Sequence, residues 1–163
     1  MKKEIVTLPE IKLIGISVRT NNKNEMNPSA AKIGKVIGQY FHQASLNAIP
    51  NLTDSETSYS VYTNYENDHN GDYTYFFGGQ VNSFDSVPAG YEILTIPPQV
   101  YAKFTTGRAA MPAVVIESWQ QIWQMTSKDF GGKRRYIADF EIYDKRAKDP
   151  SKAIVDIFVG INQ

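Results

Sequence analysis

Two carboxylates, Asp139 and Glu141, lie in the middle of residues 136–144 (YIADFEIYD), a segment typical of a β-strand. Because side chains alternate between the two faces of a strand, both carboxylates share one face with Ile137 and Tyr143. On a face open to water, Glu141 would be an ordinary surface residue. In an aromatic cleft it would be a partly buried acid, and such a charge is costly without a partner. An organic cation could be that partner, with each cation–π contact adding roughly 0.5–2 kcal/mol.

Further aromatic residues are predicted on the walls of the same cleft. Residues 58–66 and 73–77 are expected to pair as a hairpin that forms one wall. Their cleft-facing residues are predicted to be Val61, Thr63 and Tyr65 on the first strand and Tyr73, Tyr75 and Phe77 on the second. Trp119 and Trp123 lie one turn apart on a predicted helix; either could reach the cleft, and core packing is the alternative for Trp119. The opposite face of the 136–144 strand, with Phe140, is expected to pack against helices. The candidate ligand-binding residues are Glu141, Tyr143, Tyr65, Tyr75, Phe77, Trp119 and Asp139.

Other site chemistries find little support in the residues. The only histidines are His42, on a predicted helix, and His69, in a predicted turn, and no nucleophile elbow accompanies them. The chain has no Cys, which excludes thiolate metal sites and a cysteine nucleophile. No glycine pattern has the spacing of a phosphate-binding loop. We therefore assign no catalytic residue, no metal site and no cofactor.

The elements that would position these residues occur in the same order twice. Strand–helix–strand–strand is predicted in the first half and again in the second, each within about 80 residues. This order predicts an α+β fold of duplicated β-α-β-β units, with one antiparallel sheet, two helices on one face and a central cleft. We expect one domain, residues 1–163, with pseudo-repeats at about 1–82 and 91–163. The expected strands are 11–18, 58–66, 73–77, 100–105, 136–144 and 153–161, and the expected helices are 28–45 and 111–127.

Composition narrows the classes of partner. The 163 residues carry 17 basic and 17 acidic side chains, so a basic surface for nucleic acid or membrane is not expected. No apolar run is long enough to span a bilayer, and a cytoplasmic protein, monomeric or homodimeric, is expected. Aromatic residues make up 12% of the chain, led by ten Tyr, a residue suited to the walls of half-wet pockets.

Four segments resemble the effector-binding domain family, also called GyrI-like, which includes the ligand modules of AraC-type and multidrug-sensing MerR-type regulators. They are residues 101–105 (YAKFT), 117–123 (ESWQQIW), 139–144 (DFEIYD) and 155–159 (VDIFV). The sequence looks most similar to stand-alone members encoded by integron cassettes. The resemblance implies an SHS2-type duplication. It also implies that the motif's glutamate, Glu141 here, and its tyrosine, Tyr143, meet cationic aromatic compounds in a central cleft.

Three functions follow from these observations. The first is a stand-alone small-molecule-binding module for amphipathic cations, linked by its family to transcription regulation. The second is a hydrolase that uses Glu141 with Tyr143, as in some relatives that resemble this family. The third is a protein-interaction module resembling gyrase inhibitors.

Overall fold

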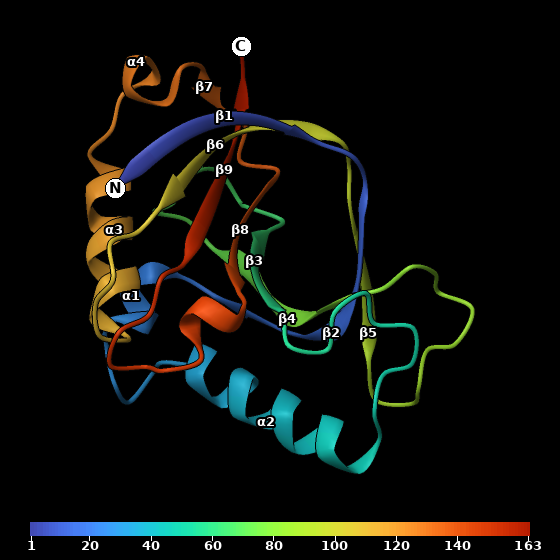
Figure 1. Cartoon of the computed structure of the whole chain (residues 1–163). Helices are drawn as coiled ribbons and strands as arrows, with labels where there is room; N and C mark the ends of the chain where they lie inside the picture. The colour runs from blue at the N-terminus through green and yellow to red at the C-terminus, as the bar shows by residue number, and fades with distance from the viewer.

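A nine-stranded antiparallel sheet forms the centre of the structure (Figure 1), a computed structural model that describes all 163 residues. This sheet and its helices confirm the predicted α+β class. A short strand, β7 (Lys133–Arg134), pairs with β9 beside the main order. From edge to edge the other strands are β1 (Lys2–Leu8), β6 (Gln99–Thr105), β9 (Asp156–Asn162), β8 (Ala138–Tyr143), β3 (Ser58–Thr63), β4 (Tyr73–Gln80), β2 (Ile11–Thr20) and β5 (Glu92–Ile96).

The strand order is symmetric about the contact between β3 and β8. Exchanging β1 with β5, β2 with β6, β3 with β8 and β4 with β9 reproduces the same order from the other edge. The leading strands are exchanged between the halves, because β1 pairs with β6 and β5 pairs with β2. This symmetry supports the predicted duplication. The sequence prediction lacked β1 and β5, because these edge strands are mostly exposed and show little of the buried alternation that marks inner strands.

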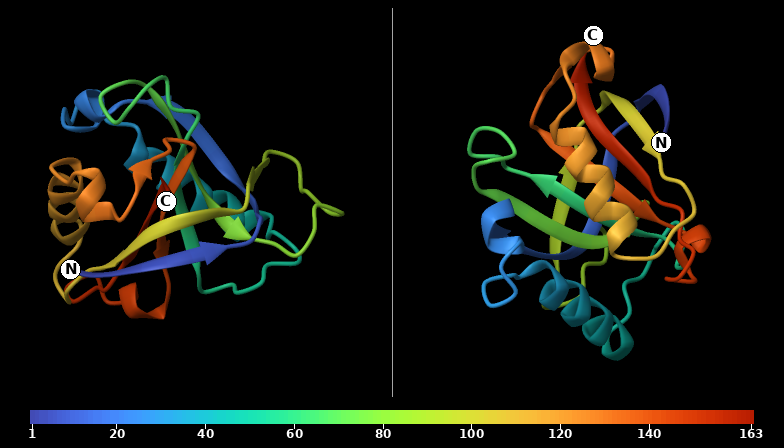
Figure 2. Two further views of the ribbon diagram at one scale, coloured as in Figure 1. Left: turned by 90° about the horizontal axis from the view of Figure 1, so that it is seen from above. Right: turned by 90° about the vertical axis from the view of Figure 1, so that its left-hand side faces the viewer.

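Two long helices cover one face of the sheet, α2 (Ile33–Leu46) and α3 (Ala113–Trp123) (Figure 2). The remaining helical turns are α1 (Asn22–Glu25), α4 (Ser127–Phe130) and the 3-10 turn η1 (Lys145–Ala147). α2 begins five residues later than predicted, because the preceding chain forms α1 and then a turn. The carboxylate of Glu25 accepts the backbone N–H of Ile33 at 3.0 Å and so caps the start of α2. No helix is both long enough and apolar enough to cross a membrane.

The buried side chains form three clusters on the two faces of the sheet. One cluster packs beneath α3 with β6 and β9, and a second beneath α2 with β2 and β4. The third lies on the opposite face and contains no helical residue. Phe140 belongs to this third cluster, stacked on Phe158 at 4.6 Å between ring centroids.

The prediction that the Phe140 face packs against helices is therefore wrong. The sheet curves around its own apolar face, where side chains of β1, β2 and β5 join the cluster that contains Phe140. The helices lie instead on the face that carries Glu141, because Trp119 of α3 contacts Glu141 directly. A strand buried on both faces does not reveal from its pattern which face meets helices.

Candidate functional site

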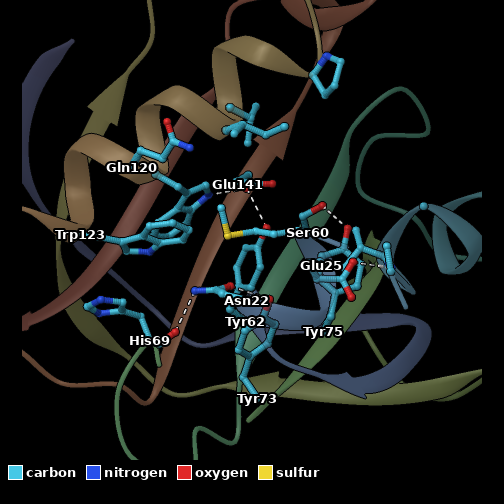
Figure 3. A pocket seen from close by; sticks show the side chains of 18 of the residues that line it. Asn22, Glu25, Ser60, Tyr62, His69, Tyr73, Tyr75, Gln120, Trp123 and Glu141 are labelled. Carbon is cyan, nitrogen blue, oxygen red and sulfur yellow. Dashed lines mark hydrogen bonds between the residues drawn. The ribbon is translucent and has the colours of Figure 1, made fainter. Parts of the chain in front are cut away.

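A cavity of about 640 Å³ opens on the helical face of the sheet, where α1, α2 and α3 meet the central strands (Figure 3). Of the 23 residues that line it, 14 are hydrophobic, so its character is apolar with a few polar groups. Its volume falls in the range of small-molecule sites, roughly 300–1,000 Å³. The lining residues of the central strands are Ser60, Tyr62, Tyr73, Tyr75, Glu141 and Tyr143, and those of α3 are Val115, Ile116, Trp119, Gln120 and Trp123.

Glu141 lies in the floor of this cavity and is only 1% exposed. One carboxylate oxygen, Oε1, accepts hydrogen bonds from the Trp119 indole at 2.6 Å and from the Tyr62 hydroxyl at 2.9 Å. The other, Oε2, accepts from the Tyr143 hydroxyl at 2.7 Å. No Lys, Arg or His forms an ion pair with it. The carboxylate is thus held by three neutral donors in a place that water barely reaches.

Burial raises the pKa of Glu141 above its ordinary value of 4.5, and the three donors offset part of that rise. Burial, followed by the nearby Glu141 charge, also raises the pKa of Tyr62 and Tyr143 well above 10.0. Both phenols therefore stay protonated and act as donors. The result is a preorganised carboxylate whose negative charge has no positive partner in the protein.

Asp139, two residues earlier on β8, has a different environment although it is also fully buried. Its Oδ2 accepts from Arg134 Nη2 and from the Tyr65 hydroxyl, both at 2.7 Å. Its Oδ1 accepts from the backbone N–H of Gly160 at 2.8 Å. Asp139 is therefore fully paired within the protein and is not among the residues that line the cavity.

Glu25 is the second acid that lines the cavity. Its carboxylate accepts the backbone N–H groups of Lys32 and Ile33 and the hydroxyl of Thr20. Its charge is thus satisfied by the N-terminus of α2. This leaves Glu141 as the lining carboxylate without compensation.

Aromatic rings surround the Glu141 carboxylate. Tyr62 forms edge-to-face contacts with Trp119 and Tyr75, at 5.3 and 5.5 Å between ring centroids. Tyr75 also shares a 2.6 Å hydrogen bond with Ser60, the residue opposite Glu141 in the β3–β8 pairing. The rings hold one another in place, which limits the reorganisation that a bound ligand would require.

The structure brings five of the seven candidate residues together around the cavity: Glu141, Tyr143, Tyr65, Tyr75 and Trp119. Asp139 lies beside it in the ion pair with Arg134. Phe77 lies apart, in the core beneath α2, with its ring 5.2 Å from that of Tyr40. No group of three or more His, Cys, Asp or Glu side chains is arranged as metal ligands.

Sequence reasoning missed Tyr62 and placed Tyr65 by an incorrect strand phase. Tyr62 faces the cavity, whereas its neighbour Val61 packs in the cluster on the opposite face. Tyr65 still reaches the cavity because β3 ends at Thr63 and Asn64 adopts φ 48°, which breaks the alternation. Asn adopts the left-handed backbone conformation more readily than most residues, so Asn64 within the predicted strand 58–66 was a sequence signal that the strand could end there.

His69 and Trp123 also line the cavity without having been assigned to it (Figure 3). Their rings are stacked, with centroids 5.7 Å apart and planes 4° from parallel. Trp123 follows Trp119 by one helical turn, which is why both reach the same cavity. His69 comes from the loop between β3 and β4, whose path the sequence does not define.

Comparison with known proteins identifies the family. A family model described as Cass2, integron-associated effector binding protein, matches residues 4–161. The chain belongs to this family. It is 31% identical over 149 residues to the "Putative transcriptional regulator protein YobU" of Bacillus subtilis strain 168, with 91% of each chain covered. The resemblance expected from the sequence is thereby confirmed.

Two solved structures show the same effector-binding fold. The integron cassette protein VCH_CASS2 of Vibrio cholerae has a TM-score of 0.74 and 30% identity, with 98% of this chain and 95% of that chain covered. The protein SAV2435, solved bound to tetraphenylphosphonium, has a TM-score of 0.75, with 99% of this chain and 94% of that chain covered. At 17% identity, SAV2435 supports the shared fold alone.

Proposed function

We propose that this member of the effector-binding family binds amphipathic, aromatic organic cations in the 640 Å³ cavity, in the service of transcription regulation. The observation that carries this proposal is the uncompensated carboxylate of Glu141. It is buried, lined by aromatic rings and free of any ion pair with the protein.

The physical reason is the cost of a buried charge. Three neutral hydrogen bonds replace part of the hydration of the Glu141 carboxylate, but they supply no opposite charge. A ligand cation would supply it, while the apolar wall would bury the rest of the ligand. The rings of Trp119, Tyr62 and Tyr75 would add cation–π attraction, about 0.5–2 kcal/mol for each well-placed contact.

Tetraphenylphosphonium, the compound bound by SAV2435, is a cation inside a shell of four phenyl rings. Its chemistry matches what the cavity offers here, a single buried acid within aromatic walls. It is therefore a suitable first probe for this chain.

A hydrolase that uses Glu141 as a general base remains the second candidate, favoured by the raised pKa of this acid beside Tyr143. Binding is preferred because both carboxylate oxygens already accept hydrogen bonds, and those bonds lower the basicity of Glu141. Turnover of an ester substrate that is lost in Glu141→Gln would favour the hydrolase instead.

The test is a titration followed by intrinsic fluorescence. Trp119 and Trp123 are the only tryptophans, and both line the cavity. We expect tetraphenylphosphonium to quench this fluorescence and to bind at least ten times more tightly than neutral triphenylmethane, which has aromatic rings but neither a charge nor an acceptor oxygen, a margin of about 1.4 kcal/mol. Equal affinity for the two compounds would mean that the cavity selects apolar surface and not positive charge.

A further inference from the structure

The cavity has a second polar end, displaced from Glu141 by one turn along α3 and by two residues along β8. Trp119 and Trp123 are four residues apart on α3, about 6 Å along its axis. Glu141 and Asp139 are two residues apart on β8, about 7 Å along the strand. Trp119 donates to Glu141, whereas Trp123 stacks on His69. The second polar end is therefore about 6–7 Å from Glu141, roughly the span between two groups at para positions of one phenyl ring.

Arg134 supplies unused hydrogen-bond donors at this second end. Its side chain is 7% exposed and lines the cavity. Only Nη2 is bonded, to Asp139, and the buried Nε–H has no partner. The guanidinium is held in place by Asp139 and by the ring of Tyr136, 4.3 Å away. A buried donor without a partner is rare in native structures and costs free energy.

His69 places a second unpartnered atom on the cavity wall. Its Nδ1 is buried without a hydrogen bond, while its ring lies against Trp123 (Figure 3). Its backbone is fixed, because its carbonyl oxygen accepts from Asn22 Nδ2 at 2.8 Å. Burial and the Arg134 charge both lower the pKa of His69, so the ring is neutral at neutral pH. With Arg134 neutralised by Asp139, this end offers hydrogen-bonding nitrogens with little net charge.

We infer that Arg134 and His69 form a subsite for an acceptor oxygen, such as an ester or amide carbonyl, on the same ligand whose cation faces Glu141. This inference rests on the proposed function and specifies its ligand class. The favoured ligands are aromatic cations that carry a carbonyl group one benzene ring away from the charge. An acceptor oxygen placed there would accept from the Arg134 Nε–H and from His69 in its Nδ1–H tautomer, two nitrogens that the protein leaves unpaired.

Two phosphonium ions that differ only in this acceptor test the inference. One is tetraphenylphosphonium, and the other carries a methyl ester at the para position of one ring. In the unmodified chain we expect the ester to bind roughly three to ten times more tightly, the gain typical of one hydrogen bond. The readout is quenching of the two tryptophans, checked by calorimetry.

Two variants separate the subsite from the rest of the cavity. His69→Phe keeps a ring against Trp123 but lacks Nδ1. Arg134→Lys keeps a positive charge for Asp139 but lacks the Nε donor. In each variant we expect the ratio of the two affinities, ester over tetraphenylphosphonium, to fall toward one, whatever the substitution does to the binding that both ions share.

The outcomes distinguish this inference from the proposed function. If tetraphenylphosphonium binds but the ester has no advantage, or keeps it in both variants, the subsite is overturned and the cation site stands. If neither ion binds the unmodified chain, the proposed function fails and the subsite fails with it. Should Arg134→Lys not fold, His69→Phe alone decides.

Discussion

Replacing Glu141 by Gln removes the negative charge of the cavity while keeping the size of the side chain. A monocation centred about 5–6 Å from the carboxylate gains roughly 3 kcal/mol at an effective dielectric constant of about 20. Losing this attraction should weaken the binding of tetraphenylphosphonium roughly a hundredfold. Affinity for neutral triphenylmethane should change little, because its burial does not depend on the charge.

The same substitution should leave the free energy of unfolding almost unchanged. The Gln amide oxygen can accept from Trp119 and Tyr62, and the Tyr143 hydroxyl can turn to accept from the amide nitrogen. The variant also removes the cost of burying an unpaired charge. We therefore expect a change within about 1 kcal/mol.

Asp139→Asn is the matched control, two residues away on the same strand. This carboxylate is paired with Arg134 at 2.7 Å, and its loss leaves a buried guanidinium without its counter-charge. Breaking a buried pair in this way costs about 3–5 kcal/mol. Urea unfolding measures both variants, and fluorescence titration measures the affinity for tetraphenylphosphonium.

Two results would refute this reasoning about Glu141. Binding of tetraphenylphosphonium by Glu141→Gln within threefold of the unmodified chain would show that the carboxylate is not the counter-charge. Destabilisation of Glu141→Gln as large as that of Asp139→Asn would show that Glu141 serves the fold in the absence of ligand.

Three further predictions concern pH, the indole donor and two glycines. As pH falls through the raised pKa of Glu141, cation binding should weaken. Over the same pH range the fold should gain stability relative to Glu141→Gln, because the folded state then binds more protons than the unfolded state. Titrations and urea unfolding across pH check both signs. Trp119→Phe removes a donor that lowers the pKa of Glu141, so the pH midpoint of binding, followed through Trp123, should shift upward. Gly78→Ala would place Cβ 2.2 Å from the carbonyl oxygen of Ile14 and should destabilise by about 1–3 kcal/mol or more in thermal unfolding. Gly38→Ala, a helical position with nothing within 4 Å, should stabilise by up to about 1 kcal/mol in the same assay; a loss there would contradict the open space seen beside it.

The inner strands and both long helices could be predicted from the sequence, because their apolar residues recur at the periods of buried strands and helices. The alternation in residues 136–144 placed Asp139 and Glu141 on one face, and both are buried there. Residue types also indicated an aromatic cavity, and five of the candidates line one.

Only the tertiary structure decided which of the two acids faces the cavity without a charged partner. Periodicity makes Asp139 and Glu141 equivalent, and the difference between them comes from residues brought by other elements. Arg134 of β7 reaches Asp139, while Trp119 of α3 and Tyr62 of β3 reach Glu141.

The unpaired nitrogens of Arg134 and His69 likewise have no signature in the sequence, since an unmet hydrogen bond is a property of packed neighbours. The sequence alone determined the elements and the chemical types along each strand, because both depend on local spacing. The tertiary structure determined which charges are paired, because pairing depends on contacts between distant segments.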